Sequence, residues 1–184
     1  MIAYIGGTFD LLHPGHLRLF KRLYQLGYEV VVSLNTDEFA ARYKRPPIFT
    51  LKERVEMVTA CQWVDKVVVN RGDEDSRQTI LDSHATVIVH GDDWQGEPLM
   101  AQMGFDQAWL DHHRIKMLYV PYSEGISTSE VIGRCASQLS ARSTDAAKTA
   151  FRSSTESWWI PRGSLTKHGW SAKPKMTLAA FTTR

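Results

Sequence analysis

The hydrophobic positions of this 184-residue chain form two alternating patterns over residues 1–138. Short apolar runs rich in valine and isoleucine are typical of strands buried on both faces of a parallel sheet. Between them, apolar residues recur every three or four positions, as they do on one face of a helix. The strand-like runs cover residues 1–6, 28–34, 64–70, 86–91 and 115–121, and the helix-like stretches cover 16–27, 50–62, 77–84 and 127–138.

This alternation predicts an α/β fold, with a Rossmann-like, five-stranded parallel sheet and helices on both of its faces. Local signals agree with the helix positions. Thr50 and Glu53 have the spacing of a capping box at the start of one helix, and Gly27 ends another. In open parallel sheets, ligands bind beyond the carboxyl ends of the strands. The residues that follow each strand are therefore the first candidates for chemistry.

The stretch GGTFDLLHPGH follows the first predicted strand and leads into the first helix. Gly6 and Gly7 let the backbone turn and approach a ligand closely. The N-terminus of the helix favours an anion there, because its free N–H groups and its dipole point outward. His13 and His16 are three residues apart, so both can face that ligand and donate hydrogen bonds to phosphate oxygens. The alternative is that His13 caps the helix and His16 is a surface residue.

A second motif, YSEGISTSEVI, occupies residues 122–132, between the fifth strand and the last helix. Ser127, Thr128 and Ser129 place three hydroxyls and three backbone N–H groups at a helix N-terminus, and Gly125 permits the preceding turn. An ordinary cap needs only one hydroxyl. Two helix N-termini directed at one ligand are a better match to a nucleoside triphosphate than to a single phosphate, so the second motif favours the ligand-binding role of the histidines.

Together, GTFDLLHPGH and EGISTS resemble the cytidylyltransferase family of H-x-G-H nucleotidyltransferases. The segments NTDEFAARYKRPP, ERVEMV, WVDKVVV and GDDWQG resemble intervening parts of that family, and they are closest to its glycerol-3-phosphate branch. The resemblance covers residues 1–138. The H-x-G-H element alone is also shared with adenylyltransferases, whereas the full set of segments is more specific.

The resemblance implies that a phosphate ester attacks the α-phosphorus of CTP and releases pyrophosphate, which yields a CDP-activated precursor of a polymer or lipid. Glycerol 3-phosphate is the preferred acceptor. The alternatives are ethanolamine phosphate or choline phosphate as acceptor, an adenylyltransferase that uses ATP, and a nucleotide-binding regulator without turnover. Catalysis would consist of positioning and charge stabilisation. Mg²⁺ is expected to be bound mainly through the nucleotide, with no metal site built by the protein.

The resemblance also implies roles for single residues. His13, His16 and Lys44 are the expected catalytic residues. The expected nucleotide-binding residues are Thr8, Phe9, His13, His16, Arg45, Asp92, Asp93, Glu124, Gly125, Ile126, Ser127, Thr128 and Ser129, with Asp92 or Asp93 accepting from the amino group of cytosine. The expected residues for the acceptor are Asp10, Lys44, Arg54 and Arg77. Several have a simpler alternative: Phe9 could lie in the core, Lys44 and Arg45 in a solvated loop, Asp92 or Asp93 in a turn, and Arg54 in a surface ion pair with Glu53 or Glu56. Tyr122 and Gln62 stand where the family usually has arginine.

Charge divides the chain into two parts. Residues 1–136 contain 14 Lys and Arg against 18 Asp and Glu, and residues 137–184 contain 8 against 2. The second part is rich in Ser and Thr and has no hydrophobic periodicity. We therefore expect a nucleotidyltransferase domain over 1–136 and a basic, disordered or loosely packed extension over 137–184.

The sequence also limits the partners and the compartment. Its apolar runs are shorter than the ~18 residues of a membrane span, and the first residues lack the basic start of a secretory signal. Cys61 and Cys135 have no metal-ligand spacing and are interpreted as reduced thiols. We expect a cytoplasmic protein that binds CTP and a small phosphate ester, without nucleic acid or a membrane span. The resemblance implies a homodimer.

Overall fold

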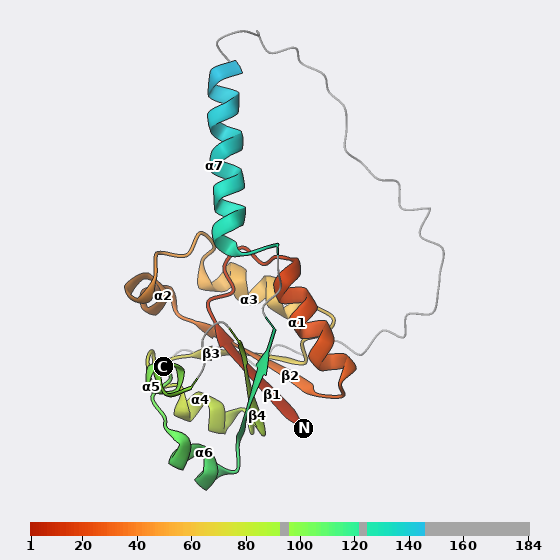
Figure 1. The fold of residues 1–184 in the computed structure, drawn as a ribbon, viewed down its shortest axis with the longest axis vertical. Helices are drawn as coiled ribbons and strands as arrows, with labels where there is room; N and C mark the ends of the chain where they lie inside the picture. Colours follow the sequence, from red (N-terminus) through yellow and green to blue (C-terminus); the bar gives the residue numbers. More distant parts are fainter. Residues whose placement is uncertain (93–95, 122–124, 146–184) are drawn as a thin grey trace, which may run out of the picture.

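The computed structural model describes residues 1–92, 96–121 and 125–145, and the side chains of these residues as far as 140. Its centre is one sheet of five parallel strands in the order β3-β2-β1-β4-β5 (Figure 1). The strands are β1 (Ile2–Gly7), β2 (Glu29–Asn35), β3 (Lys66–Asn70), β4 (Val87–Gly91) and β5 (Lys116–Val120). The predicted Rossmann-like fold is confirmed.

Helices cover both faces of the sheet because strand side chains alternate between the faces. Ala3 and Ile5 of β1 face a core that includes Phe20 and Leu23 of α1 (Pro14–Gln25) and Val58 of α3 (Leu51–Thr59). Tyr4, between them, faces the opposite core. That second core includes buried residues of α4 (Arg77–Asp82), α5 (Glu97–Gln102) and α6 (Gln107–His113).

The order of the strands locates the binding edge. The chain fills the sheet outward from β1 through β2 to β3, and then returns to the other side of β1 with β4 and β5. The connections after β1 and β4 therefore leave the sheet in different directions, which opens a crevice at the carboxyl ends of these two strands. The start of α1 follows β1 at this edge.

Four features differ from the sequence-based expectation. The helices α2 (Asp37–Tyr43), α5 and α6 were not expected, since each has only six or seven residues and shows too little periodicity to be recognised. The last helix, α7 (Thr128–Asp145), continues beyond its expected end at 138 and projects away from the sheet (Figure 1). The rest of the expected C-terminal extension, from residue 146, lies outside the described residues. Within the described part of the chain, no helix combines the length and apolar character needed to cross a membrane.

Candidate active site

The two histidines at the start of α1 use one ring nitrogen each to cap the helix. Nδ1 of His13 accepts a hydrogen bond from the backbone N–H of Gly15 at 3.2 Å, and Nδ1 of His16 accepts from the backbone N–H of His13 at 3.4 Å. The rings stack with centroids 3.8 Å apart. Since an accepting nitrogen carries no hydrogen in a neutral imidazole, this network assigns the hydrogen of each ring to Nε2. The capping role and a ligand-binding role are therefore compatible, and each ring retains one N–H donor.

The second motif lies directly against this pair. A Cβ on Gly15 would be 3.0 Å from the His13 ring and 3.4 Å from Cγ2 of Ile126, so only glycine allows this close approach without displacing its neighbours. The hydroxyl of Thr128 at the start of α7 donates to the carbonyl of Asp10 at 3.2 Å. The N-termini of α1 and α7 are thus held side by side by contacts between the two motifs.

Both helix N-termini open into one cavity of about 450 Å³ at the crevice beside β1. Ten of the expected site residues line it: Thr8, Phe9, Asp10, His13, His16, Lys44, Arg45, Ser127, Thr128 and Ser129. The imidazole pair and the hydroxyl-rich turn therefore face the same space. Free N–H groups, hydroxyls and imidazole N–H donors in such a cavity suit a polyanionic ligand.

The histidines are neutral in this environment. Burial, reinforced by the proximity of the His13 ring, lowers the pKa of His16 to about 3. Burial also lowers the pKa of His13, against an opposing effect of Glu130. The edge-to-face contact between Phe9 and His16, with centroids 5.1 Å apart, contributes to the apolar surroundings. At neutral pH the site therefore offers two neutral N–H donors.

This pKa shift makes the stability of the ligand-free protein depend on pH. Unfolded His16 takes up a proton near pH 6.5, whereas the folded protein resists protonation until about pH 3. The unfolded state thus binds more protons below pH 6.5, and folding stability is lost as the pH falls. We expect up to about 1.4 kcal/mol per pH unit from this group between pH 6 and 5.

Urea denaturation of wild type and His16→Asn at pH 7, 6 and 5 measures the effect. Asn removes the titrating group, so its slope between pH 6 and 5 should be smaller by roughly 1 kcal/mol per pH unit. Carboxylates with lowered pKa values, such as Asp10 and Glu53, lose their contribution only nearer pH 4 and below. Parallel profiles for the two proteins would contradict the assignment.

Asp10 holds the loop of residues 44–50, which contains Lys44 and Arg45, and does not present free oxygens to the cavity. Its carboxylate is only 4% exposed and accepts from the backbone N–H groups of Ile48 and Phe49, both at 3.0 Å. Arg45 pairs with it at 2.9 Å. Burial opposes ionisation, but these three donors lower the pKa of Asp10 overall. Of the described Lys and Arg residues that line the cavity, Lys44 is the one without an ion pair.

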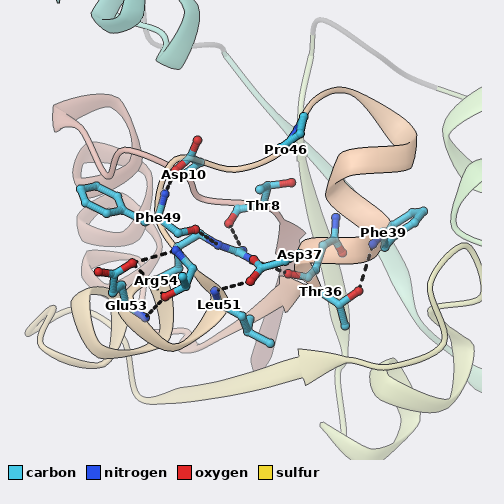
Figure 2. Close-up of polar contacts among 12 residues, drawn as sticks. Thr8, Asp10, Thr36, Asp37, Phe39, Pro46, Phe49, Leu51, Glu53 and Arg54 are labelled. Carbon is cyan, nitrogen blue, oxygen red and sulfur yellow. Dashed lines mark hydrogen bonds and ion pairs between the residues drawn. The ribbon is translucent and has the colours of Figure 1, made fainter.

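Arg54 occupies a different position from the one expected, because it does not line the cavity. Its side chain is fully buried and ion-paired with Asp37 at 2.6 Å. Its other donors reach the carbonyl of Asn35 and, as Figure 2 shows, the carbonyls of Thr8 and Phe49. Thr8 follows β1, Asn35 is the last residue of β2, and Phe49 precedes α3. Arg54 therefore ties together the segments that carry the site, and neither the phosphate-binding role nor a surface pair with Glu53 or Glu56 describes it.

Arg77, Asp92 and Gly125, the next expected residues that the structure describes, are not among the residues that line the cavity. Arg77 is half-exposed and pairs with Asp75 at 2.7 Å. The backbone N–H of Asp92 donates to the carbonyl of Val120 and links the ends of β4 and β5. Gly125 has the left-handed φ of +77° expected at the turn before α7. Asp93, Glu124 and Tyr122 lie outside the described residues.

Several lining residues were missed by the sequence analysis: Tyr4, Asn35, Phe39, Tyr43, Asp73, Ser76, His90, Leu99, Gln102 and Met103 are among them. Two had a signal in the sequence. Tyr4 brings a hydroxyl into an otherwise apolar strand, and His90 comes directly before the GDDW segment at the end of a strand.

A Rossmann-like sheet with two helix N-termini and paired imidazoles around one cavity is the arrangement of a nucleotidyltransferase, an enzyme. The sequence itself then gives the family. Residues 4–134 match the family described as cytidylyltransferase-like, and the chain belongs to it.

The relatives of this chain include cytidylyltransferases named for two different phosphate esters and an FAD synthase. The chain is 35% identical over 125 residues to glycerol-3-phosphate cytidylyltransferase of Bacillus subtilis (strain 168), an alignment that covers 68% of this chain and 89% of the relative. It is 32% identical over 136 residues to ethanolamine-phosphate cytidylyltransferase of Arabidopsis thaliana, covering 72% of this chain and 31% of the relative. It is 31% identical over 131 residues to FAD synthase of Pyrococcus abyssi (strain GE5 / Orsay), covering 71% and 88%.

A solved structure supports the fold. The lipopolysaccharide core biosynthesis protein of Thermoplasma volcanium GSS1 superposes with a TM-score of 0.54 at 24% identity, and the superposition covers 67% of this chain and 99% of that protein. At this identity, the likeness concerns the architecture alone.

Proposed function

We propose that this protein transfers CMP from CTP to glycerol 3-phosphate and releases pyrophosphate. The convergence of the histidine pair and the hydroxyl-rich start of α7 on one cavity is the observation that carries the proposal. The similarity to the Bacillus subtilis enzyme, which extends over 89% of that relative, favours glycerol 3-phosphate as acceptor.

The chemistry needs no nucleophile from the protein. A phosphate oxygen of the acceptor forms a bond to the α-phosphorus of CTP while the bond from that phosphorus to the bridging oxygen breaks. Pyrophosphate leaves with the electron pair. Nε2–H groups of His13 and His16 would donate to the α- and β-phosphate oxygens, and Lys44 would neutralise charge on the transferring group. One such preorganised donor contributes about 3–4 kcal/mol to the stabilisation of the transition state.

We also propose that Mg²⁺ enters with the nucleotide. The described residues contain no group of three His, Cys, Asp or Glu side chains arranged to hold a metal ion. Both oxygens of Asp10 already accept hydrogen bonds, so this carboxylate fits the role of a loop anchor better than that of a ligand. The triphosphate and water would supply the metal ligands, and the ion would offset phosphate charge.

A substrate panel tests the reaction. Pyrophosphate release is measured with CTP, ATP, GTP and UTP, each combined with glycerol 3-phosphate, ethanolamine phosphate or choline phosphate. We expect turnover with CTP and glycerol 3-phosphate at a kcat/KM at least about tenfold above every other pair, because discrimination by a few specific hydrogen bonds is worth this much or more. Turnover with ATP in place of CTP would reject the nucleotide assignment. CTP binding without turnover on any ester would identify a regulator.

We further propose that the protein acts as a homodimer in the cytoplasm. β3 is an edge strand, and Val67, Val68 and Val69 on it are only half-buried, which leaves apolar surface for a second copy. Cys61 and Cys135 are both free thiols, which agrees with a reducing compartment such as the cytoplasm. Light scattering of the purified protein measures its mass in solution, and cell fractionation measures its location.

A further inference from the structure

Several residues that line the cavity are not accounted for by the phosphate-binding groups. Tyr4, Ser76, His90 and Gln102 are among them, and they come from β1, the segment before α4, β4 and α5. His13, His16 and Ser127, by contrast, come from the N-terminal ends of α1 and α7. The described residues that line the cavity do not include Asp92, the proposed cytosine contact at the β4–β5 edge.

Tyr4 carries a buried hydroxyl that lacks a hydrogen-bond partner. The residue is 0% exposed, and its Oη makes no hydrogen bond in the structure. The hydroxyls of Ser33 and Ser76 lie near enough to lower its pKa slightly, but they do not reach hydrogen-bond geometry with it. Burial dominates and raises the pKa of Tyr4 to about 12, so the group keeps its proton. A buried donor of this kind is destabilising unless a ligand completes it.

The hydroxyl lies next to space left open by Gly6. A Cβ on Gly6 would be 3.4 Å from Cε1 of Tyr4, 3.8 Å from its Oη and 3.8 Å from Cε of Met103. These are ordinary contact distances, so glycine leaves the Tyr4 hydroxyl closer to the cavity than a residue with a larger side chain would. Gly6 and Met103 both line the cavity.

His90 supplies the complementary acceptor. Its Nδ1 lies 3.1 Å from the carbonyl oxygen of Gly91, which can only accept a hydrogen bond. This contact places a hydrogen on Nδ1, so in the tautomer with one ring hydrogen Nε2 is the acceptor. An alcohol hydroxyl both accepts and donates, so it can accept from Tyr4 and donate to an imidazole. Gln102 adds an amide with both capacities.

The charges of the residues that line the cavity argue against an acceptor that carries an ammonium group. An ammonium group has only donors and is stabilised by a carboxylate. Asp10 and Asp73 are the described carboxylates that line the cavity. Asp10 is occupied by Ile48, Phe49 and Arg45, as described above. Asp73 is paired with Arg42 at 2.6 Å. Tyr4, His90 and Gln102 thus offer hydrogen-bonding groups to the cavity, and the described lining residues include no uncommitted anion.

We propose that Tyr4 is a specificity-determining residue. With His90 and Gln102, it binds a hydroxyl of an acceptor whose phosphate is attached to an uncharged polyol. This inference rests on the proposed function and deepens it, because it selects hydroxylated acceptors over ethanolamine phosphate and choline phosphate from the chemistry of the cavity itself. The phosphate of the acceptor would lie toward Lys44 and its alcohol part toward Tyr4.

Tyr4→Phe tests the proposal because it removes one oxygen and leaves the ring in place. The variant should fold with an unchanged or higher melting temperature in the absence of ligand, since no hydrogen bond is lost. Its KM for glycerol 3-phosphate should rise about tenfold, while its KM for CTP stays within about twofold. Discrimination between glycerol 3-phosphate and 3-hydroxypropyl phosphate, which lacks one hydroxyl, should shrink by a similar factor.

Tyr28→Phe is the matched control and should change neither KM. Tyr28 is half-buried and directly precedes β2, so it lies at the amino ends of the strands, away from the cavity. Unchanged acceptor kinetics in Tyr4→Phe would overturn the inference while leaving the proposed function intact. A selective rise in the KM for CTP would assign the hydroxyl to the nucleotide and overturn it also. A lower melting temperature with unchanged kinetics would identify a purely structural group. Failure of the wild type to turn over any phosphate ester would reject the proposed function and this inference with it.

Discussion

Replacing His16 by alanine is expected to lower kcat by about 10²–10³-fold or more while the protein stays folded. Nε2–H of His16 is a preorganised donor in a buried site, and loss of one such donor typically has this effect on the chemical step. The ring also completes the capping box of α1, and losing this contact should reduce folding stability by only about 1 kcal/mol. Single-turnover kinetics with CTP and urea denaturation measure the two quantities separately.

His16→Asn distinguishes catalysis from capping. The amide oxygen of Asn can accept from the backbone N–H of His13 as Nδ1 does now, but Asn is too short to place a donor where Nε2 lies. We expect near-wild-type stability at pH 7 and a loss of kcat close to that of the alanine variant. His112→Ala, an exposed histidine of α6, should retain full activity. If His16→Asn keeps a near-normal rate, the ring is a cap and has no direct part in catalysis.

The parts of this site that follow from local sequence were the predictable ones. The histidine pair, the hydroxyl-rich turn and the glycine before it belong to two continuous motifs, each at the end of an apolar run. A parallel sheet brings such ends together whatever the details of its packing. Their convergence on one cavity therefore required only the correct order of strands.

Residues whose role depends on tertiary packing could not be predicted in the same way. The sequence places Arg54 on a helix after a basic loop, but only the packed structure brings Asp37 and three carbonyls from distant segments around it. The hydroxyl of Tyr4 is noticeable in an apolar strand, but its position at the cavity follows only from the packing of α5 against that face of the sheet. Helices as short as α5 and α6 show little periodicity of their own. They form because packing against the core stabilises them.

Arg54→Met is expected to reduce the free energy of unfolding by about 3–5 kcal/mol. The substitution leaves the carbonyls of Thr8, Asn35 and Phe49 without their donors, and each unsatisfied buried group costs about 1–3 kcal/mol. Asp37 contributes less, because it is 39% exposed and water can solvate it. Urea denaturation with a two-state fit measures the difference. Arg18→Met, on the exposed side of α1, should stay within about 0.5 kcal/mol of wild type.

Arg54→Lys separates this architectural role from direct binding of the acceptor. Lysine keeps the charge but loses the planar fork that reaches partners in several directions, so we expect a clear loss of stability and reduced kcat together with a raised KM for both substrates. Both substrates are affected because Arg54 holds the segment after β1 and the end of β2, and both contribute residues to the lining of the shared cavity. A residue that only bound the acceptor phosphate would behave differently, since its lysine variant would unfold like wild type and raise the KM of the acceptor alone. The combination of urea denaturation with both KM values therefore decides between a buried clamp and a substrate contact.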